Sequence, residues 1–335
     1  MKKNIARNFL PDKPLVLKKD DRLGYSKFAE NLSRGLINAN ATEGLVVSLN
    51  GKWGSGKTTI LNFIFDEIDK LPETQKPIVI RFNPWWFSGQ DDLIRNFFDQ
   101  LRTTLDSKEL KIEGLKDLIG DFAQAVGDYY PDIPWQARII TRFLFKVRPK
   151  QNIPELKSKI SEKLAKLDSR IFVVIDDIDR LIPEEIRQIF RLIKAVADFP
   201  NIIYILAFDK DVAIKSLESI QKISGSEYLE KIVQASFDVP TPEKSLLNTL
   251  FTDKLNQIFN KLPQKAFETN RWQSVFFDGI EKFLSTPRSV TKFYNSLSIT
   301  YPALKNEVNP VDFVAIESLR QFSPYAYDII RLNEK

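Results

Sequence analysis

The chain of 335 residues contains no cysteine and no histidine. The lack of cysteine excludes disulfide bonds, thiolate catalysis and zinc sites built on cysteine. The lack of histidine excludes imidazole general bases and histidine metal ligands. Any catalysis must therefore depend on carboxylates, lysines, arginines, hydroxyls or main-chain groups, together with a bound cation.

Long hydrophobic runs are also missing. No stretch reaches the roughly 18 apolar residues that a membrane-spanning helix needs, and the N-terminal residues lack the apolar core and cleavage site of a signal peptide. The sequence therefore predicts a cytoplasmic protein without an integral membrane segment. A net charge of +5 permits contact with nucleic acid or a membrane surface, but a lysine-rich solvated surface explains it equally well.

Glycine is scarce, yet three of the 12 glycines lie within six positions, in the segment GKWGSGKT at residues 51–58. This segment fits the pattern G-x-x-x-x-G-K-[ST], and it lies between an apolar run typical of a buried strand and a helical pattern. Glycines let the main chain curl so that its N–H groups face phosphate oxygens, and the following helix adds its positive end. The predicted phosphate-binding residues are Gly51, Trp53, Gly54, Ser55, Gly56, Lys57, Thr58 and Thr59.

Within this segment, Lys57 is expected to reach the β- and γ-phosphates, and the Thr58 hydroxyl to bind Mg²⁺. Thr59 either caps the helix or contacts the α-phosphate. The guanine-reading pattern N-K-x-D is missing, since the nearest string, at residues 208–211, lacks the asparagine. ATP with Mg²⁺ is therefore the expected ligand.

An acidic string, IFVVIDDID at residues 171–179, supplies the carboxylates that a metal–phosphate site needs. Asp176 would end a buried strand beside the phosphate loop and bind Mg²⁺ through water. Asp177 is the best candidate for the base that activates the attacking water. In the alternative interpretation, Asp177 and Asp179 only start the next helix, and Asp179 pairs with Arg180.

Four strand-like apolar runs, at residues 44–50, 77–82, 170–175 and 201–208, are separated by helical patterns. Such alternation predicts an α/β fold with a parallel sheet flanked by helices. After about Pro240 only helical patterns follow. We therefore expect a P-loop NTPase core at residues 1–240, with a helical insertion at about 105–168, and an all-helical lid at 241–335.

Several strings occur in an order that resembles the KAP family of P-loop NTPases, within the group that includes AAA+ and STAND ATPases. They are GKWGSGKTTIL, RFNPWWFSGQDDLIRNFF, IFVVIDDIDRL, IIYILAFDKDV, YLEKIVQASFDVP and TPRSVTKFYNSL. The resemblance implies an ATP-hydrolysing module, often membrane-associated, that recurs in bacterial defence against phages and plasmids. Many members carry transmembrane helices in the insertion, but here that segment is charged, which puts membrane attachment in doubt.

The resemblance also implies roles for residues outside the phosphate loop. By this resemblance, Arg288 would be a sensor arginine that closes onto the γ-phosphate, and the alternative is a surface arginine. Asp209, at the end of the fourth strand and beside the second and third strand ends, either senses the γ-phosphate or caps a helix. Asn83 is placed, by its position after the second strand, to orient water or contact phosphate. A neighbouring subunit would donate an arginine, for which Arg180 and Arg187 are only candidates.

Two further features leave alternatives open. The aromatic residues 85–87 either pack a loop against the core or contact nucleotide or a neighbouring subunit. The basic residues Arg138, Arg142 and Lys146 either form the solvated face of a packed helix or contact a nucleic-acid backbone or a membrane surface.

Three functions fit these patterns. The first is an ATPase switch or motor, the second a nucleotide-gated scaffold with negligible turnover, and the third a DNA-stimulated ATPase. The expected partners are further copies of the chain or a separate effector protein, and nucleic acid remains possible.

Overall fold

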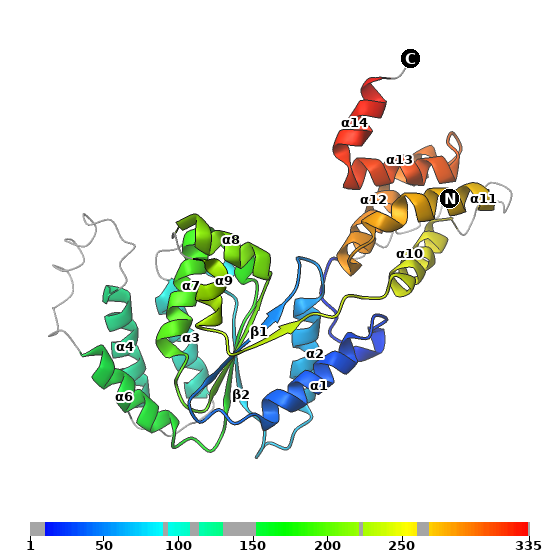
Figure 1. Cartoon of the computed structure of the whole chain (residues 1–335). Helices are drawn as coiled ribbons and strands as arrows, with labels where there is room; N and C mark the ends of the chain where they lie inside the picture. Colours follow the sequence, from blue (N-terminus) through cyan, green and yellow to red (C-terminus); the bar gives the residue numbers. More distant parts are fainter. Residues whose placement is uncertain are drawn as a thin grey trace, which may run out of the picture. The chain divides into compact units, whose positions relative to one another are not determined.

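A five-stranded parallel sheet forms the centre of the α/β part of the protein (Figure 1). The computed structural model describes residues 11–89, 93–107, 114–129, 152–220, 224–259 and 268–333. All neighbouring strands are parallel, in the order β2-β3-β4-β1-β5. The strands are β1 (Leu45–Asn50), β2 (Ile78–Phe82), β3 (Ile171–Ile175), β4 (Ile202–Phe208) and β5 (Ala235–Asp238).

The prediction of four strands is confirmed for β1 to β4, but it missed β5. This strand is only four residues long, and its side chains alternate between half-buried and exposed, so it presents no apolar run. The strand order corrects a second expectation. Strand β4, which ends just before Asp209, pairs with β1 and β3, and it is not a neighbour of β2.

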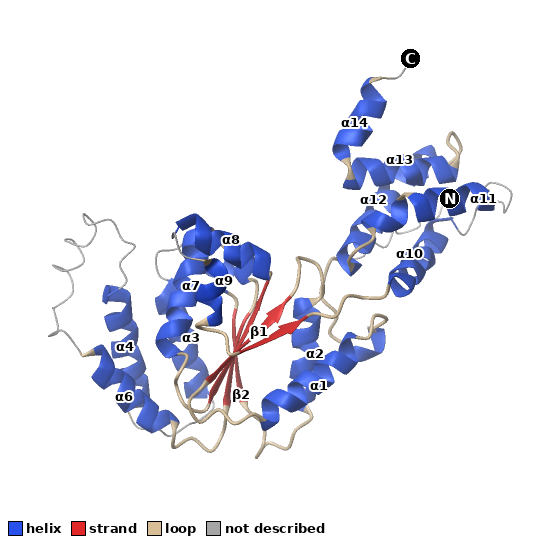
Figure 2. Ribbon diagram, viewed as in Figure 1, coloured by secondary structure: helices blue, strands red, loops and turns tan. Residues whose placement is uncertain are grey.

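Helices cover both faces of the sheet (Figures 1 and 2). One face carries α1 (Tyr25–Asn38) and α2 (Lys57–Asp69). The opposite face carries α3 (Leu93–Ser107), α7 (Pro183–Val196) and α8 (Lys210–Ile220), and α8 contacts α9 (Gly225–Glu230). In the described part of the predicted insertion, α4 (Leu115–Tyr129) packs on α3, and α6 (Ile153–Leu164) packs on α4.

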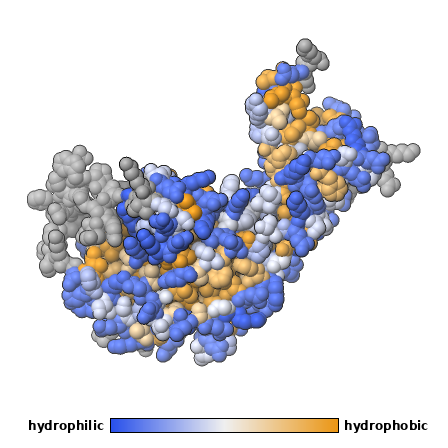
Figure 3. Space-filling view, viewed as in Figure 1, coloured by the Kyte–Doolittle hydropathy of each residue, from blue (hydrophilic) through white to orange (hydrophobic). Residues whose placement is uncertain are grey.

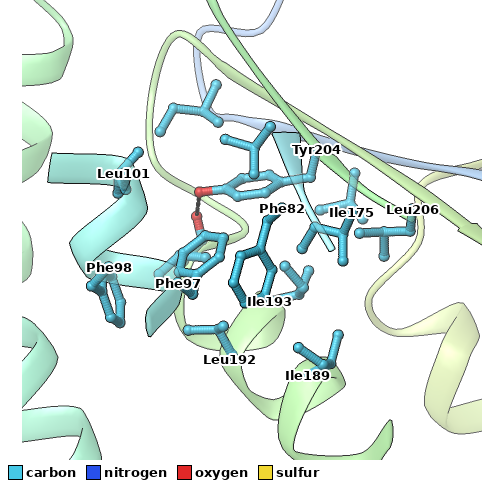
Figure 4. Packing of buried hydrophobic residues seen from close by; sticks show 14 of the residues in the cluster. Phe82, Phe97, Phe98, Leu101, Ile175, Ile189, Leu192, Ile193, Tyr204 and Leu206 are labelled. Atoms are coloured by element: carbon cyan, nitrogen blue, oxygen red, sulfur yellow. Dashed lines mark hydrogen bonds between the residues drawn. The ribbon is translucent and has the colours of Figure 1, made fainter. Parts of the chain in front are cut away.

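One hydrophobic cluster of this part consists of strand residues and the apolar faces of the helices on α3's side of the sheet. Leu36 of α1 and Ile64 of α2 are buried as well. Phe82, Phe97 and Phe98 meet edge to face, with ring centroids 5.3–5.4 Å apart. Tyr204 of β4 is buried among them, and its hydroxyl donates to the main-chain oxygen of Val196 at 2.9 Å (Figure 4). The single polar atom of this aromatic cluster is thus satisfied, as burial requires.

The chain divides into two compact units. One comprises Ala29–Lys52 and Phe63–Val239, and the other comprises Met1–Phe28, Trp53–Asn62 and Pro240–Lys335. The second unit has its own hydrophobic core, in which Phe251 stacks on both Phe276 and Phe293. Its C-terminal helices are α10 (Lys244–Phe259), α11 (Thr269–Asp278), α12 (Pro287–Leu304), α13 (Pro310–Phe322) and α14 (Pro324–Leu332).

Helix α14 exposes the apolar residues Ile329, Ile330 and Leu332, and it also exposes the charged residues Asp328 and Arg331 (Figure 3). Across the described ranges, no helix combines the length and hydropathy that a bilayer crossing demands. The basic residues Arg138, Arg142 and Lys146 lie outside the described residues.

The described structure also contains short 3₁₀ helices, namely η1 (Lys18–Asp20), η2 (Pro84–Phe87), η3 (Ile178–Arg180) and η5 (Ile280–Phe283).

Candidate functional site

The predicted phosphate loop joins the end of β1 to the start of α2. The Gly51 N–H donates to the main-chain oxygen of Phe208 at 3.1 Å, so the loop starts at the carboxyl edge of the sheet, beside β4. Gly54 has a φ of +82° and Gly56 a φ of +105°, values that glycine adopts without the steric cost of a Cβ. Such a curled main chain turns successive N–H groups toward one side and forms a nest for an anion.

Helix α2 begins at Lys57, directly after this nest. The Ile60 N–H donates to the Gly56 oxygen at 3.0 Å and closes the first turn, which leaves the earlier amides at the positive end of the helix. The Ser55 hydroxyl is buried and has no hydrogen-bond partner among the described residues. Because a buried hydroxyl needs a partner, the loop fits a ligand with acceptor oxygens, as a phosphate has.

Tyr25 contacts the phosphate loop, although the sequence patterns did not indicate this role. It is the first residue of α1 and only 2% exposed. Its hydroxyl donates to the main-chain oxygen of Ser55 at 2.7 Å. A Cβ built on Gly56 would lie 2.8 Å from the Tyr25 ring. The ring therefore leaves no room for a side chain at position 56.

Thr59 is bonded to the N-terminal segment. The Leu15 N–H donates to the Thr59 hydroxyl at 3.1 Å, and the Asn62 side-chain amide donates to the Leu15 oxygen at 2.9 Å. Residues 15, 59 and 62 belong to the same compact unit. The N-terminal segment thus holds the first two turns of α2 through both main-chain groups of Leu15.

Arg288 lies against the phosphate loop. Its guanidinium group lies over the Trp53 ring, 4.3 Å from the centroid, and its Nε donates to an Asp12 carboxylate oxygen at 2.6 Å. A Cβ on Gly54 would come within 2.7 Å of the Arg288 Cβ. The same Trp53 ring is 5.0 Å from the Lys292 ammonium, one turn further along α12. The spacing of Arg288 and Lys292 on one helix face was a signal available in the sequence.

The acidic residues after β3 form a hydrogen-bonded group. The Asp177 N–H donates to a carboxylate oxygen of Asp176 at 2.8 Å. One oxygen of Asp177 accepts from the Asn83 side-chain amide at 2.8 Å, and the other accepts from Arg180 Nε at 2.7 Å. Asp177 itself has a φ of +61°, a value seldom adopted by residues other than glycine.

The three aromatics after β2 are placed differently. Phe87 stacks on Phe82 of the core at 5.7 Å, as the packing interpretation expects. Trp86 is 72% exposed, and Trp85 is 47% exposed beneath the Arg180 guanidinium group. Arg180 therefore contacts both Asp177 and Trp85, which orients its side chain.

Asp209 starts the helix after β4. Its side chain accepts from the Asp211 N–H at 3.1 Å, and its main-chain oxygen accepts from Ala213 at 3.0 Å. This is the helix-capping geometry. A role in sensing phosphate stays a prediction.

The phosphate loop between β1 and α2, together with the strand order of the parallel sheet, defines a P-loop NTPase fold. The model of the KAP family P-loop domain matches residues 25–304, and the chain belongs to this family. It is 28% identical, over 341 residues, to the phage T7 exclusion protein of Escherichia coli K12. The match covers 92% of this chain and 46% of that protein. The chain therefore spans about half the length of this curated relative.

The chain is also similar to the following two solved structures. The Cdc6p protein of Pyrobaculum aerophilum is 15% identical, with a TM-score of 0.45, covering 94% of this chain and 70% of that one. A chain of the Drosophila ORC bound to DNA is 12% identical, with a TM-score of 0.47, covering 97% of this chain and 66% of that one.

Proposed function

We propose that the protein binds ATP with Mg²⁺ and hydrolyses it. The observation that carries this proposal is the loop after β1, where Gly54 and Gly56 have positive φ and the buried Lys57 begins a helix. The loop offers main-chain amides, a helix N-terminus and a lysine to the same phosphates. ATP is preferred to GTP because the sequence lacks the guanine-reading pattern.

The metal would be held by the Thr58 hydroxyl and, through water, by Asp176. Both supply oxygen ligands, which Mg²⁺ prefers. When bound, Mg²⁺ would neutralise charge that develops on the phosphate oxygens. Asp177 would accept the proton of the attacking water, and Asn83 would orient the Asp177 carboxylate through their hydrogen bond.

Arg288 would stabilise negative charge on the γ-phosphate. Its contact with Trp53 and its closeness to Gly54 support this role, because they hold the guanidinium group beside the loop. Only Nε of the guanidinium is bonded to Asp12, and a guanidinium group has further N–H donors for a phosphate.

The test is ATP hydrolysis by the purified protein with Mg²⁺, beside the Lys57→Ala variant. We expect turnover in the wild type and its loss in Lys57→Ala, because Lys57 is buried at the start of α2, where its ammonium would meet the phosphates. Lys52→Ala is a matched control, since Lys52 lies in the same loop and is exposed. Undiminished hydrolysis in Lys57→Ala would refute the assignment of this site.

A nucleotide-gated switch with slow turnover is the second candidate. It is favoured by the hydrogen bonds that Asn83 and Arg180 make to both oxygens of Asp177. A carboxylate whose two oxygens already accept hydrogen bonds is less available to receive a proton from an attacking water. Single-turnover measurements separate the candidates: fast hydrolysis supports the motor, whereas tight binding with hydrolysis slower than about one event per hour supports the switch.

We further propose that the chain acts in defence against phages, as a self-assembling module or together with an effector protein. The support is its similarity to the phage T7 exclusion protein, of which it spans 46%. This activity would take place in the cytoplasm, where ATP is available. The test is the plating efficiency of phage T7 on bacteria that express the wild type or Lys57→Ala, and equal plating on both would contradict the proposal.

A further inference from the structure

The Tyr25 hydroxyl makes a hydrogen bond to the main chain of the phosphate loop. Its donor oxygen lies 2.7 Å from the Ser55 carbonyl oxygen, and the side chain is 2% exposed. Tyr25, Ser55 and Gly56 all belong to the same compact unit. This contact therefore joins α1 to the middle of the loop.

The geometry of a trans peptide gives the contact a consequence. The C=O of one residue and the N–H of the next point in opposite directions across a planar peptide unit. Among the described residues there is no cis peptide bond. When the Ser55 carbonyl points toward Tyr25, the Gly56 N–H must point away from it. The Gly56 N–H belongs to the loop that would surround the phosphates.

We propose that Tyr25 is a positioning residue for the phosphate loop: its hydroxyl orients the Ser55–Gly56 peptide and thereby directs the Gly56 N–H toward a nucleotide phosphate. This inference rests on the proposed function of the loop. It assigns Tyr25 no contact with the nucleotide itself.

The local structure holds Tyr25 in place. Asp21 accepts from the Leu23 N–H at 3.0 Å and from the Ser26 N–H at 2.7 Å, which fixes the first turn of α1. The Tyr25 ring is packed against Gly56, where no larger residue fits. Burial, with the nearby Asp21 charge, raises the pKa of Tyr25 far above its usual range, so the hydroxyl stays protonated and remains a donor.

A pair of matched variants tests this role. Tyr25→Phe removes the hydroxyl and keeps the ring that packs on Gly56. Tyr204→Phe is the control, because the Tyr204 hydroxyl is also buried and donates to a main-chain oxygen, that of Val196, at 2.9 Å. Each variant loses one hydrogen bond of the same kind, so a general loss of stability should be similar in both.

The measurement is the Kd of ADP and ATP with Mg²⁺ by calorimetry, beside the thermal unfolding midpoint. We expect Tyr25→Phe to raise both Kd values about 5- to 10-fold, the effect of about one hydrogen bond. In steady-state hydrolysis KM should rise more than kcat falls. Tyr204→Phe should leave each Kd within about twofold of the wild type, by the same reckoning.

The inference would be overturned by an unchanged Kd in Tyr25→Phe or by equal weakening in both variants. A protein with 3-fluorotyrosine at position 25 keeps the hydroxyl and the packing, so its Kd must stay near that of the wild type; a rise as large as in Tyr25→Phe counts against the hydroxyl. If the wild type itself binds no nucleotide, the proposed function fails before any variant is compared.

Discussion

Asp177 combines two features that distinguish it from an ordinary acidic side chain. Its main chain is in the left-handed region, and both of its carboxylate oxygens have partners, Asn83 and Arg180. Left-handed residues other than glycine cost about 1–3 kcal/mol and occur preferentially at functional sites. The strain and the two partners together fix the direction in which this carboxylate points.

We expect Asp177→Asn to lower ATP turnover at least about 100-fold, the usual contribution of a general base. An amide has nearly the same shape but accepts no proton, so the Kd of ATP should change little. Asp198→Asn is the control, because Asp198 pairs with Lys157 at the surface. Turnover kept by Asp177→Asn would show that the water is activated by another group.

Arg288 and Lys292 provide a second comparison of single side chains. Both cations contact the Trp53 ring, at 4.3 and 5.0 Å, but Arg288 also lies beside Gly54. We expect Arg288→Ala to lower turnover about 100-fold, as loss of a charge-stabilising donor does, and Lys292→Ala to lower it less than about threefold, as for a surface charge. Steady-state kinetics measures both. Equal losses would mean that the two residues serve only to hold Trp53.

Local motifs were predictable at the scale of single residues, and distant contacts were not. Lys57 and Asp177 were proposed as functional because each lies in a short pattern next to a strand. The contacts of Tyr25 and Asp12 were not predicted, because their partners, Ser55 and Arg288, are 30 and 276 positions away in the sequence. No periodicity in the sequence encodes a contact over such separations.

At the scale of elements, two glycines differ in whether their position requires a glycine. Gly35 is an exposed residue in the middle of α1, and nothing lies within 4 Å of a Cβ added there. Gly56 has a φ of +105°, and its Cβ would meet the Tyr25 ring at 2.8 Å. The first glycine weakens its helix, whereas the second is required by its loop.

We therefore expect Gly35→Ala to raise the free energy of unfolding by about 0.5–1 kcal/mol, the cost of glycine in a helix. Gly56→Ala should lower it by about 1–3 kcal/mol through backbone strain and abolish nucleotide binding. Chemical denaturation and calorimetry measure the two effects. If Gly56→Ala binds ATP like the wild type, the loop does not surround the phosphates as proposed.

Strands with a clear apolar run were predicted from the sequence, but the order of the strands in the sheet was not. The apolar runs of β1, β3 and β4 are buried along nearly their whole length, as expected for parallel strands covered on both faces. In β2, at the edge of the sheet, Arg81 is exposed. The position of β4 between β1 and β3 depends on long-range pairing, which these runs do not specify. Strand β5 has too few buried residues to be recognised without its partner β1.

At the scale of the whole molecule, each compact unit has its own hydrophobic core. Phe251, fully buried, stacks on Phe276 and Phe293 in the helical unit. Phe190, also fully buried, meets Phe208 edge to face in the unit that contains the sheet. Separate cores allow separate unfolding transitions.

We expect calorimetry to resolve two transitions and each core variant to lower a different one. Phe251→Ala and Phe190→Ala should each cost about 3–5 kcal/mol, the usual effect of removing a buried phenyl group. The two variants change the same residue type at the same burial, so each controls for the other. A single transition that both variants lower equally would show that the units unfold as one.

Nucleotide binding should also be visible in the stability of the whole protein. A ligand that binds only the folded state stabilises it by about 2.7 kcal/mol at a concentration of 100 Kd. We therefore expect ATP with Mg²⁺ to raise the unfolding midpoint by several degrees, and removal of Mg²⁺ with EDTA to reverse most of the rise. In Lys57→Ala the rise should be lost at the same ATP concentration. An equal rise of the unfolding midpoint in this variant would mean that ATP stabilises the protein by binding at another site. In that case, ATP bound at the loop would contribute nothing to the stabilisation.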